Sequence, residues 1–323
     1  MLMMTTLLVL ARMLHIGSAL LIVSLLYFRQ VIFRPDGTAE FGSETIALFS
    51  RRITRWLIGV FLVQVVSGGV WFWIVAADIS DNSLRDVLDF GLLKTVFGQT
   101  QFGQLWLGRM AMGIALGILL LAAGRSEHRS RGHGSTWRWL ALVAGGLLLV
   151  SLAWAGHAAS GVSHRALHLS ADIGHLAIAS VWPAGLLPLA LFLNTAVKTG
   201  PPSQLACVVA TLHRFSRTSL IAVVLLSLTG FANACFLIPS FPALFTSTYG
   251  QLLLGKIALF LAMVGLGALN RFHHLPDLDP DTPTPSDFDR LRRAILIENL
   301  LGLIVLLIVG AMGATAPPQA KLR

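Results

Sequence analysis

The residues best suited to do chemistry lie close together in the middle of the chain. One short stretch holds four histidines and one aspartate: His157, His164, His168, Asp172 and His175. Imidazole is a common ligand of copper and zinc, and ionisable side chains are costly to place beside lipid. If a helix begins near residue 164, spacings of four, four and three put the last four of these residues on one helical face. The pattern predicts a metal-binding row, in which the aspartate either ligates or orients a histidine.

A second buried histidine and two methionines extend this prediction. His15 lies in the first apolar run at about the depth of His175, about 10–12 Å below the outer surface at 1.5 Å per residue. Such a pair can hold one copper ion, or it can supply the axial ligands of a b-type haem, with His157 as an alternative partner. Met13 and Met312 lie near the outer ends of their runs, and their thioethers would favour Cu(I) over Cu(II).

Three charged residues lie within or beside apolar runs. Arg109 and Lys256 occupy equivalent places near the outer surface. Snorkelling to lipid headgroups is the simplest interpretation, and the alternatives are closing a path to cations or binding haem propionates. Glu298 lies near the inner end of the last run, where we expect it to pair with Asn270 or Arg271, or to provide an inward exit for a cation.

The composition sets the class of protein that must position these residues. Of 323 residues, 55% are hydrophobic and only 12% are charged. This is more apolar side chain than one soluble core can bury. We therefore predict an all-α polytopic membrane protein. Eight runs are long enough to cross a bilayer, near 6–28, 53–77, 104–123, 138–156, 168–194, 216–238, 250–270 and 294–314.

The basic residues predict orientation. The net charge of +9 comes from Lys and Arg at the ends of the apolar runs, where they contact lipid headgroups, so we exclude nucleic acid as a partner. Sixteen of the 24 basic residues fall in alternate connections, at 29–55, 124–138, 195–217 and 271–293. The positive-inside rule then places both termini and the histidine stretch outside, in the periplasm of a Gram-negative bacterium.

Internal similarity predicts two halves. Residues 100–111 match 247–258, residues 11–15 match 171–175, and Arg55 precedes Ser67 by the same spacing as Arg217 precedes Thr229. We expect two parallel four-helix pseudo-repeats, 1–156 and 157–323, in which His15 and His175 are symmetric partners that approach each other. Hydrolase, P-loop and EF-hand motifs are absent from the sequence, so we expect no enzyme.

Several segments carry a family resemblance. Residues 175–186 are similar to a histidine-plus-Trp-x-Gly-Gly-Leu segment, from which this chain departs at Pro183 and Ala184. Over about 150–318, the chain resembles the C-terminal copper resistance domain of the CopD family at residues 212–217, 228–234, 248–256, 269–272, Glu298, Pro317 and Pro318. The resemblance implies a bacterial inner-membrane protein that moves copper inward, with a separate periplasmic carrier of the CopC type as partner.

We therefore expect copper transport across the inner membrane. Two other functions stay open on the sequence alone. One is a membrane cytochrome whose paired histidines ligate haem b for electron transfer. The other is a copper chaperone or scaffold for assembly.

Overall fold

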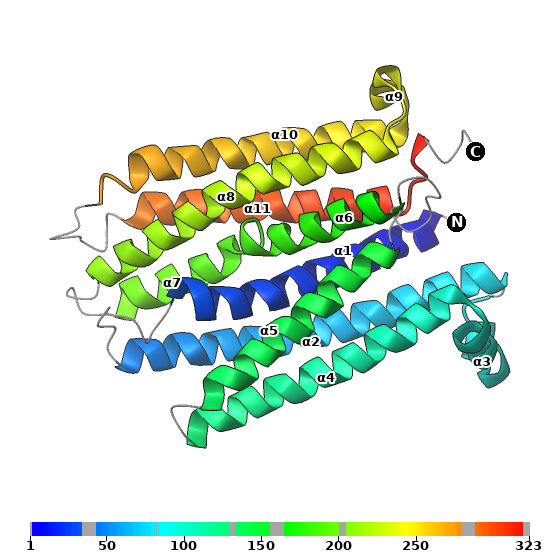
Figure 1. Cartoon of the computed structure of the whole chain (residues 1–323), viewed down its shortest axis with the longest axis horizontal. Coiled ribbons are helices and arrows are strands. Elements are labelled where there is room, and N and C mark those ends of the chain that lie inside the picture. The colour runs from blue at the N-terminus through cyan, green and yellow to red at the C-terminus, as the bar shows by residue number, and fades with distance from the viewer. Residues whose placement is uncertain are drawn as a thin grey trace.

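The computed structural model describes residues 2–33, 43–81, 83–129, 133–155, 165–199, 205–278 and 288–318. These residues form helices and connecting turns, with no strand among them, and eight helical spans are long and apolar enough to cross a membrane (Figure 1). The predicted class, an all-α polytopic membrane protein with eight spans, is confirmed.

The first four spans occupy residues up to 155. They are α1 (Leu2–Tyr27), which continues as the π-helix η1 (Phe28–Phe33), α2 (Ser43–Ser80), α4 (Gln101–Arg129) and α5 (His133–Ser151) with the short 3-10 helix η3 (Leu152–Ala155). Between α2 and α4 lie two short helices, η2 (Asp86–Leu88) and α3 (Phe90–Gln99).

The remaining spans follow the same order with one interruption. They are α6 (Arg165–Val181) with α7 (Leu186–Thr199), α8 (Leu205–Leu237), α10 (Thr248–Leu269) with the π-helix η6 (Asn270–His274), and α11 (Phe288–Gly313). The short α9 (Phe241–Thr246) precedes α10 as α3 precedes α4. Both α2 and α8 begin well before the predicted runs, because the basic residues Arg51, Arg52 and Arg214 in their early parts are compatible with a helix although they lie outside a hydropathy window.

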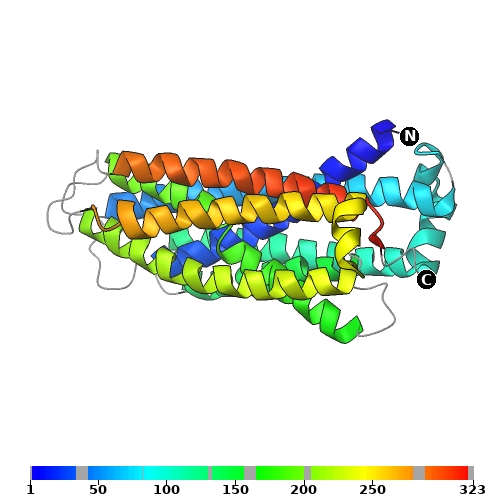
Figure 2. The same cartoon turned by 90° about the horizontal axis from the view of Figure 1, so that it is seen from above.

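Helix α1 lies inside the bundle. It packs against α2 and α5 on one side and against α6 and α11 on the other, so it joins the two sets of spans. Figure 1 shows α1 and α6 in the middle, with α10 along one edge and α4 along the opposite edge. The start of α1 and the end of α11 lie at the same end of the bundle as α3 and α9, and the view from above agrees (Figure 2).

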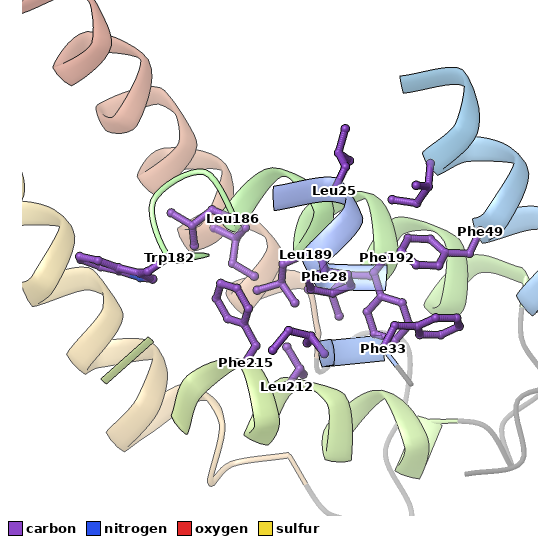
Figure 3. Close-up of a cluster of buried hydrophobic side chains, with 14 of the residues drawn as sticks. Leu25, Phe28, Phe33, Phe49, Trp182, Leu186, Leu189, Phe192, Leu212 and Phe215 are labelled. Atoms are coloured by element: carbon purple, nitrogen blue, oxygen red, sulfur yellow. The ribbon is translucent and has the colours of Figure 1, made fainter. Parts of the chain in front are cut away.

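An aromatic cluster fixes the opposite end of α1. Phe33 packs on Phe49 with ring centroids 4.8 Å apart, and Phe49 packs on Phe192 of α7 at 5.5 Å (Figure 3). The π-turn that ends α1 frees backbone carbonyls, and the Arg214 side chain donates to Ile32 O at 2.8 Å. Residues from α1, α2, α7 and α8 are thereby joined in one packed unit.

The fifth span is broken where we expected a kinked but continuous helix. Pro183 has no N–H to continue the ladder, and α6 ends at Val181. The next N–H, from Ala184, bonds to Ala179 O at 3.1 Å, five residues back instead of four. Gly185 allows this tight turn, because a Cβ there would collide with Val181 O and lie 3.0 Å from the Phe215 ring. The predicted span over 168–194 is confirmed, and the structure divides it into two helices.

The starts of α4 and α10 share one local structure. Thr100 Oγ1 accepts from Gly103 N at 2.9 Å, and Ser247 Oγ accepts from Gly250 N at 3.0 Å, so each is an N-cap. In both places the glycine abuts the preceding short helix, since an added Cβ would collide with a backbone carbonyl of α3 or α9. These matched contacts lie in the segments that the sequence aligns, and the predicted two-half repeat stays a prediction for the whole chain.

We predict that Gly103→Ala and Gly250→Ala each lower the free energy of unfolding by about 1–3 kcal/mol, the usual cost of overpacking. Thermal unfolding of the purified protein in detergent measures this. Gly113→Ala in α4 and Gly265→Ala in α10 are matched controls, because a Cβ at either position meets nothing within 4 Å. Equal losses in the two pairs would contradict the close approach.

Candidate metal site

Three of the predicted ligands share the face of α6 that packs on α8. The His168 ring stacks on Phe236 with centroids 4.8 Å apart. One helical turn further along, Asn233 Nδ2 donates to Asp172 Oδ1 at 3.5 Å, and His175 Nδ1 lies 3.0 Å from Thr229 Oγ1. The three residues on α6 are four and three residues apart, and their partners on α8, Phe236, Asn233 and Thr229, are three and four residues apart. The predicted common face is thus observed for these three residues, whereas His157 and His164 lie outside the described residues.

The hydrogen bonds around His175 determine which nitrogen is open. Thr229 Oγ1 donates its proton to Leu225 O at 2.8 Å, so it accepts from the imidazole Nδ1–H. This assignment puts the proton on Nδ1 and a lone pair on Nε2, which has no hydrogen bond to any described residue. A histidine that donates one ring N–H to a neighbouring oxygen while the other nitrogen stays open is the usual arrangement of a metal ligand.

Charged groups of α10 surround this histidine. Lys256 interacts electrostatically with both Asp172 and His175, and Tyr249 interacts with Asp172. The snorkelling interpretation of Lys256, which is half-buried, stays a prediction. A carboxylate, an imidazole and an ammonium group lie close enough to interact near the α9 end of the second set of spans.

His15 is enclosed in a different way. Its Nδ1–H donates to Gln64 O at 3.1 Å, and Gln64 Nε2 donates to His15 Nε2 at 3.2 Å. Ser18 Oγ lies 2.5 Å from Gln64 Oε1 and 3.1 Å from His15 O, so the hydroxyl links the amide to the backbone of α1. Both imidazole nitrogens are used within the protein, so His15 in this arrangement has no lone pair to offer.

The surroundings of His15 bear on the haem alternative. The ring centroids of Trp71 and Trp106 lie 5.4 and 5.6 Å from that of His15, and an added Cβ at Gly68 would lie 2.8 Å from His15 Cε1. An axial ligand needs an open nitrogen that faces a slot for the macrocycle, and these residues do not fit that requirement. The contacts of His15 go to α1, α2 and α4 and those of His175 to α8 and α10, and among the described residues no hydrogen bond or ring contact joins the two imidazoles.

The other predicted residues lie in packing positions. Arg109 is buried and donates to Ser151 O at 2.8 Å, which corrects the snorkelling interpretation for this residue. Met13 packs on Gly310 of α11, and Met312 is buried. Within the described parts of the chain, no group of three or more His, Cys, Asp or Glu side chains is arranged to hold a metal ion.

Glu298 and a cavity lie toward the opposite end. The carboxylate is 1% exposed and accepts from Asn270 Nδ2 at 2.6 Å, which confirms one expected partner; Arg271, the other, donates to Ser216 Oγ at 2.8 Å. Asn270 Oδ1 in turn accepts from His274 Nδ1 at 2.9 Å. Glu298 lines a largely apolar cavity of about 140 Å³ that Trp182, at the break between α6 and α7, also lines. Sequence reasoning missed this cavity, for which Pro183 beside Trp182 was the only signal.

The fold and the buried ionisable groups define a polytopic membrane protein with a polar row inside its bundle. Comparison with known families is specific: the model for copper resistance protein D matches residues 209–312, and the model for the copper resistance protein D-like N-terminal domain matches residues 3–165. The chain belongs to the copper resistance protein D family, and the resemblance seen in its second half is confirmed. It is a membrane protein of copper handling.

Individual relatives agree with the family. The chain is 33% identical over 226 residues to copper resistance protein D of Pseudomonas syringae pv. tomato, covering 68% of this chain and 70% of the relative. It is 33% identical over 181 residues to copper transport protein CutJ of Bacillus subtilis (strain 168), covering 56% of this chain and 32% of that relative. Inner membrane protein YebZ of Escherichia coli (strain K12) is 28% identical over 292 residues, covering 87% and 92%. No solved structure matches the chain.

We predict that Gln64→Leu lowers the free energy of unfolding by about 1–3 kcal/mol, because it leaves His15 Nε2 without a partner in a buried site. Thermal unfolding in detergent tests this. Gln104→Leu is the control, since Gln104 is exposed on α4. If both variants unfold at the same temperature as the parent protein, the Gln64 network contributes nothing to stability.

Proposed function

We propose that the protein transports copper across the bacterial inner membrane, from the periplasm inward, and that the outer half of α6 receives the ion. Family membership supports the copper chemistry, and the name of one relative, copper transport protein, supports transport. The observation that carries the site is the open Nε2 of His175, held in place by Thr229 and close to Asp172.

The proposed ligands are the His175 Nε2 and the Asp172 carboxylate, with His168, His164 and His157 as further donors on the outer side. Imidazole and carboxylate suit Cu(II) better than Cu(I). His15 is left out because both of its ring nitrogens are hydrogen-bonded. Met13 and Met312 are left out because they pack between α1 and α11 or within the core.

Lys256 provides the counter-charge in the metal-free site. Its ammonium group interacts with Asp172 and His175, so an arriving cation competes with it for the carboxylate. Further in, the break between α6 and α7 opens beside the cavity that Glu298 lines, and the hydrogen-bonded series Glu298, Asn270 and His274 continues from there. We propose this series as the inner end of the ion path.

The orientation follows the basic residues. Both termini and the start of α6 face the periplasm, where a separate carrier of the CopC type would deliver copper. The protein then acts by binding and moving the ion, and it catalyses no covalent reaction.

We predict that His175→Gln and Asp172→Asn reduce copper uptake into proteoliposomes at least about tenfold, since each removes a proposed donor. Radioactive copper accumulation measures this, and His213→Gln is the control because His213 is exposed on α8, away from the site. Thr229→Val should weaken copper binding by about 10–100-fold, the usual effect of removing the group that orients a ligand. Its matched control is Thr218→Val, which also loses a bond to a backbone carbonyl of α8.

Two outcomes would contradict this proposal. Unchanged copper uptake by the His175→Gln variant would show that the proposed site does not bind the transported ion. Copper that binds to the parent protein but does not enter proteoliposomes would exclude transport and favour a chaperone or assembly scaffold.

We predict that Lys256→Gln increases copper affinity, because it removes a positive charge that competes for Asp172. Equilibrium dialysis of the purified protein against copper measures the change. Arg217→Gln is the control, because it removes the same charge from α8 at a position away from Thr229. Weaker binding in Lys256→Gln would mean that the lysine supports the site instead of opposing the cation.

A further inference from the structure

Two arginines at the outer end of the first half stack on two adjoining tryptophans. Arg12 Cζ lies 4.7 Å from the centroid of the Trp71 ring, and Arg109 Cζ lies 5.4 Å from that of Trp106. The two indoles meet edge to face with centroids 5.8 Å apart. The two guanidinium groups are close enough to interact electrostatically, and the interaction between like charges is unfavourable.

This cluster contains donors without acceptors. Arg109 donates to Ser151 alone, whereas Arg12 Nε and Trp106 Nε1 are buried and have no hydrogen-bond partner. Trp106 is only 5% exposed. A buried donor that stays unpaired costs about 1–3 kcal/mol, and an unpaired buried cation costs more.

The rest of the outer side supplies no acidic side chain to this cluster. Neither arginine forms an ion pair within the described part of the chain. The carboxylates nearest in sequence to this end of the first half, at Asp78, Asp81, Asp86 and Asp89, form no ion pair with either arginine. The two arginines are thus without a counter-ion among the described residues.

The second half shows what kind of group is missing. Residues 11–15 align with 171–175, so Asp172 stands where Arg12 stands, and Lys256 stands where Arg109 stands. In the second half a carboxylate faces the cation. In the first half a second cation takes that place, and the carboxylate is absent.

We propose that Arg12, Arg109 and Trp106 form a binding site for a small carboxylate anion at the outer end of the first half. Guanidinium groups present paired donors that match the two oxygens of a carboxylate, and the indole Nε1–H adds a third donor. The tryptophan faces give the site apolar walls, which suit a short-chain carboxylate better than a strongly hydrated inorganic anion. The site is separate from His175 and does not depend on the proposed transport of copper.

Thermal unfolding of the full chain in detergent tests the proposal, with sodium propionate, sodium chloride and sodium phosphate compared at equal ionic strength. A ligand that binds only the folded state raises the unfolding temperature in a saturable way. We expect a saturable rise with propionate, its loss in Arg12→Gln and Arg109→Gln, and about tenfold weaker binding in Trp106→Phe, which keeps an aromatic side chain but removes the N–H donor. Arg85→Gln is the control, since Arg85 is exposed on the outer side.

The remaining outcomes overturn the proposal. No saturable rise, or an equal rise with chloride or phosphate, would show that the cluster does not select a carboxylate. An unchanged response in Arg109→Gln, or the same loss in Arg85→Gln, would show that propionate binds elsewhere. If an arginine variant fails to fold, Trp106→Phe decides, because an aromatic ring is still present beside Trp71. Unaltered propionate affinity in that variant would show that the indole N–H does not bind the carboxylate, and would overturn the assigned site.

Discussion

Every polar group that these helices carry into the bilayer must find its partner within the protein, because lipid tails offer none. The structure meets this constraint at several places with small hydrogen-bonded series that link different spans, and Arg12 Nε and Trp106 Nε1 are exceptions to it. Ser18, Gln64 and His15 tie α1 to α2, and Glu298, Asn270 and His274 tie α11 to the end of α10. Arg214 of α8 does the same for the carbonyls that the π-turn of α1 leaves open.

The same constraint separates the two buried histidines. They occupy matching places in the sequence. The neighbours of His15 form hydrogen bonds with both of its ring nitrogens, whereas those of His175 form a hydrogen bond with only one. The difference rests on position 64 of α2, where a glutamine reaches back to the imidazole; the aligned position in α8 is Leu226, which has no polar atom to offer. The first half thus holds a histidine with both ring nitrogens hydrogen-bonded, and the second half holds one whose Nε2 has no hydrogen bond to a described residue.

Hydropathy and helical periodicity were sufficient to predict the eight spans and the common face of His168, Asp172 and His175, because both depend only on residues near in sequence. The hydrogen bonds to both ring nitrogens of His15 could not be predicted from the sequence, because they depend on how α2 is rotated about its axis. Pro183 indicates that the helix of the fifth span is interrupted. A complete break, as opposed to a kink, also requires Gly185, which lets Phe215 of α8 approach. The buried position of Arg109 likewise follows from its partner Ser151 on another helix.

The break between α6 and α7 divides one membrane span into two mechanical parts. α7 is held by the aromatic cluster that contains Phe49 and Phe192, and so it is tied to α1 and α2. α6 lies along α8 and also packs on α1, and no continuous hydrogen-bonded ladder connects it to α7. A rotation of α6 about its own axis would therefore not be carried into α7 by the backbone of the span.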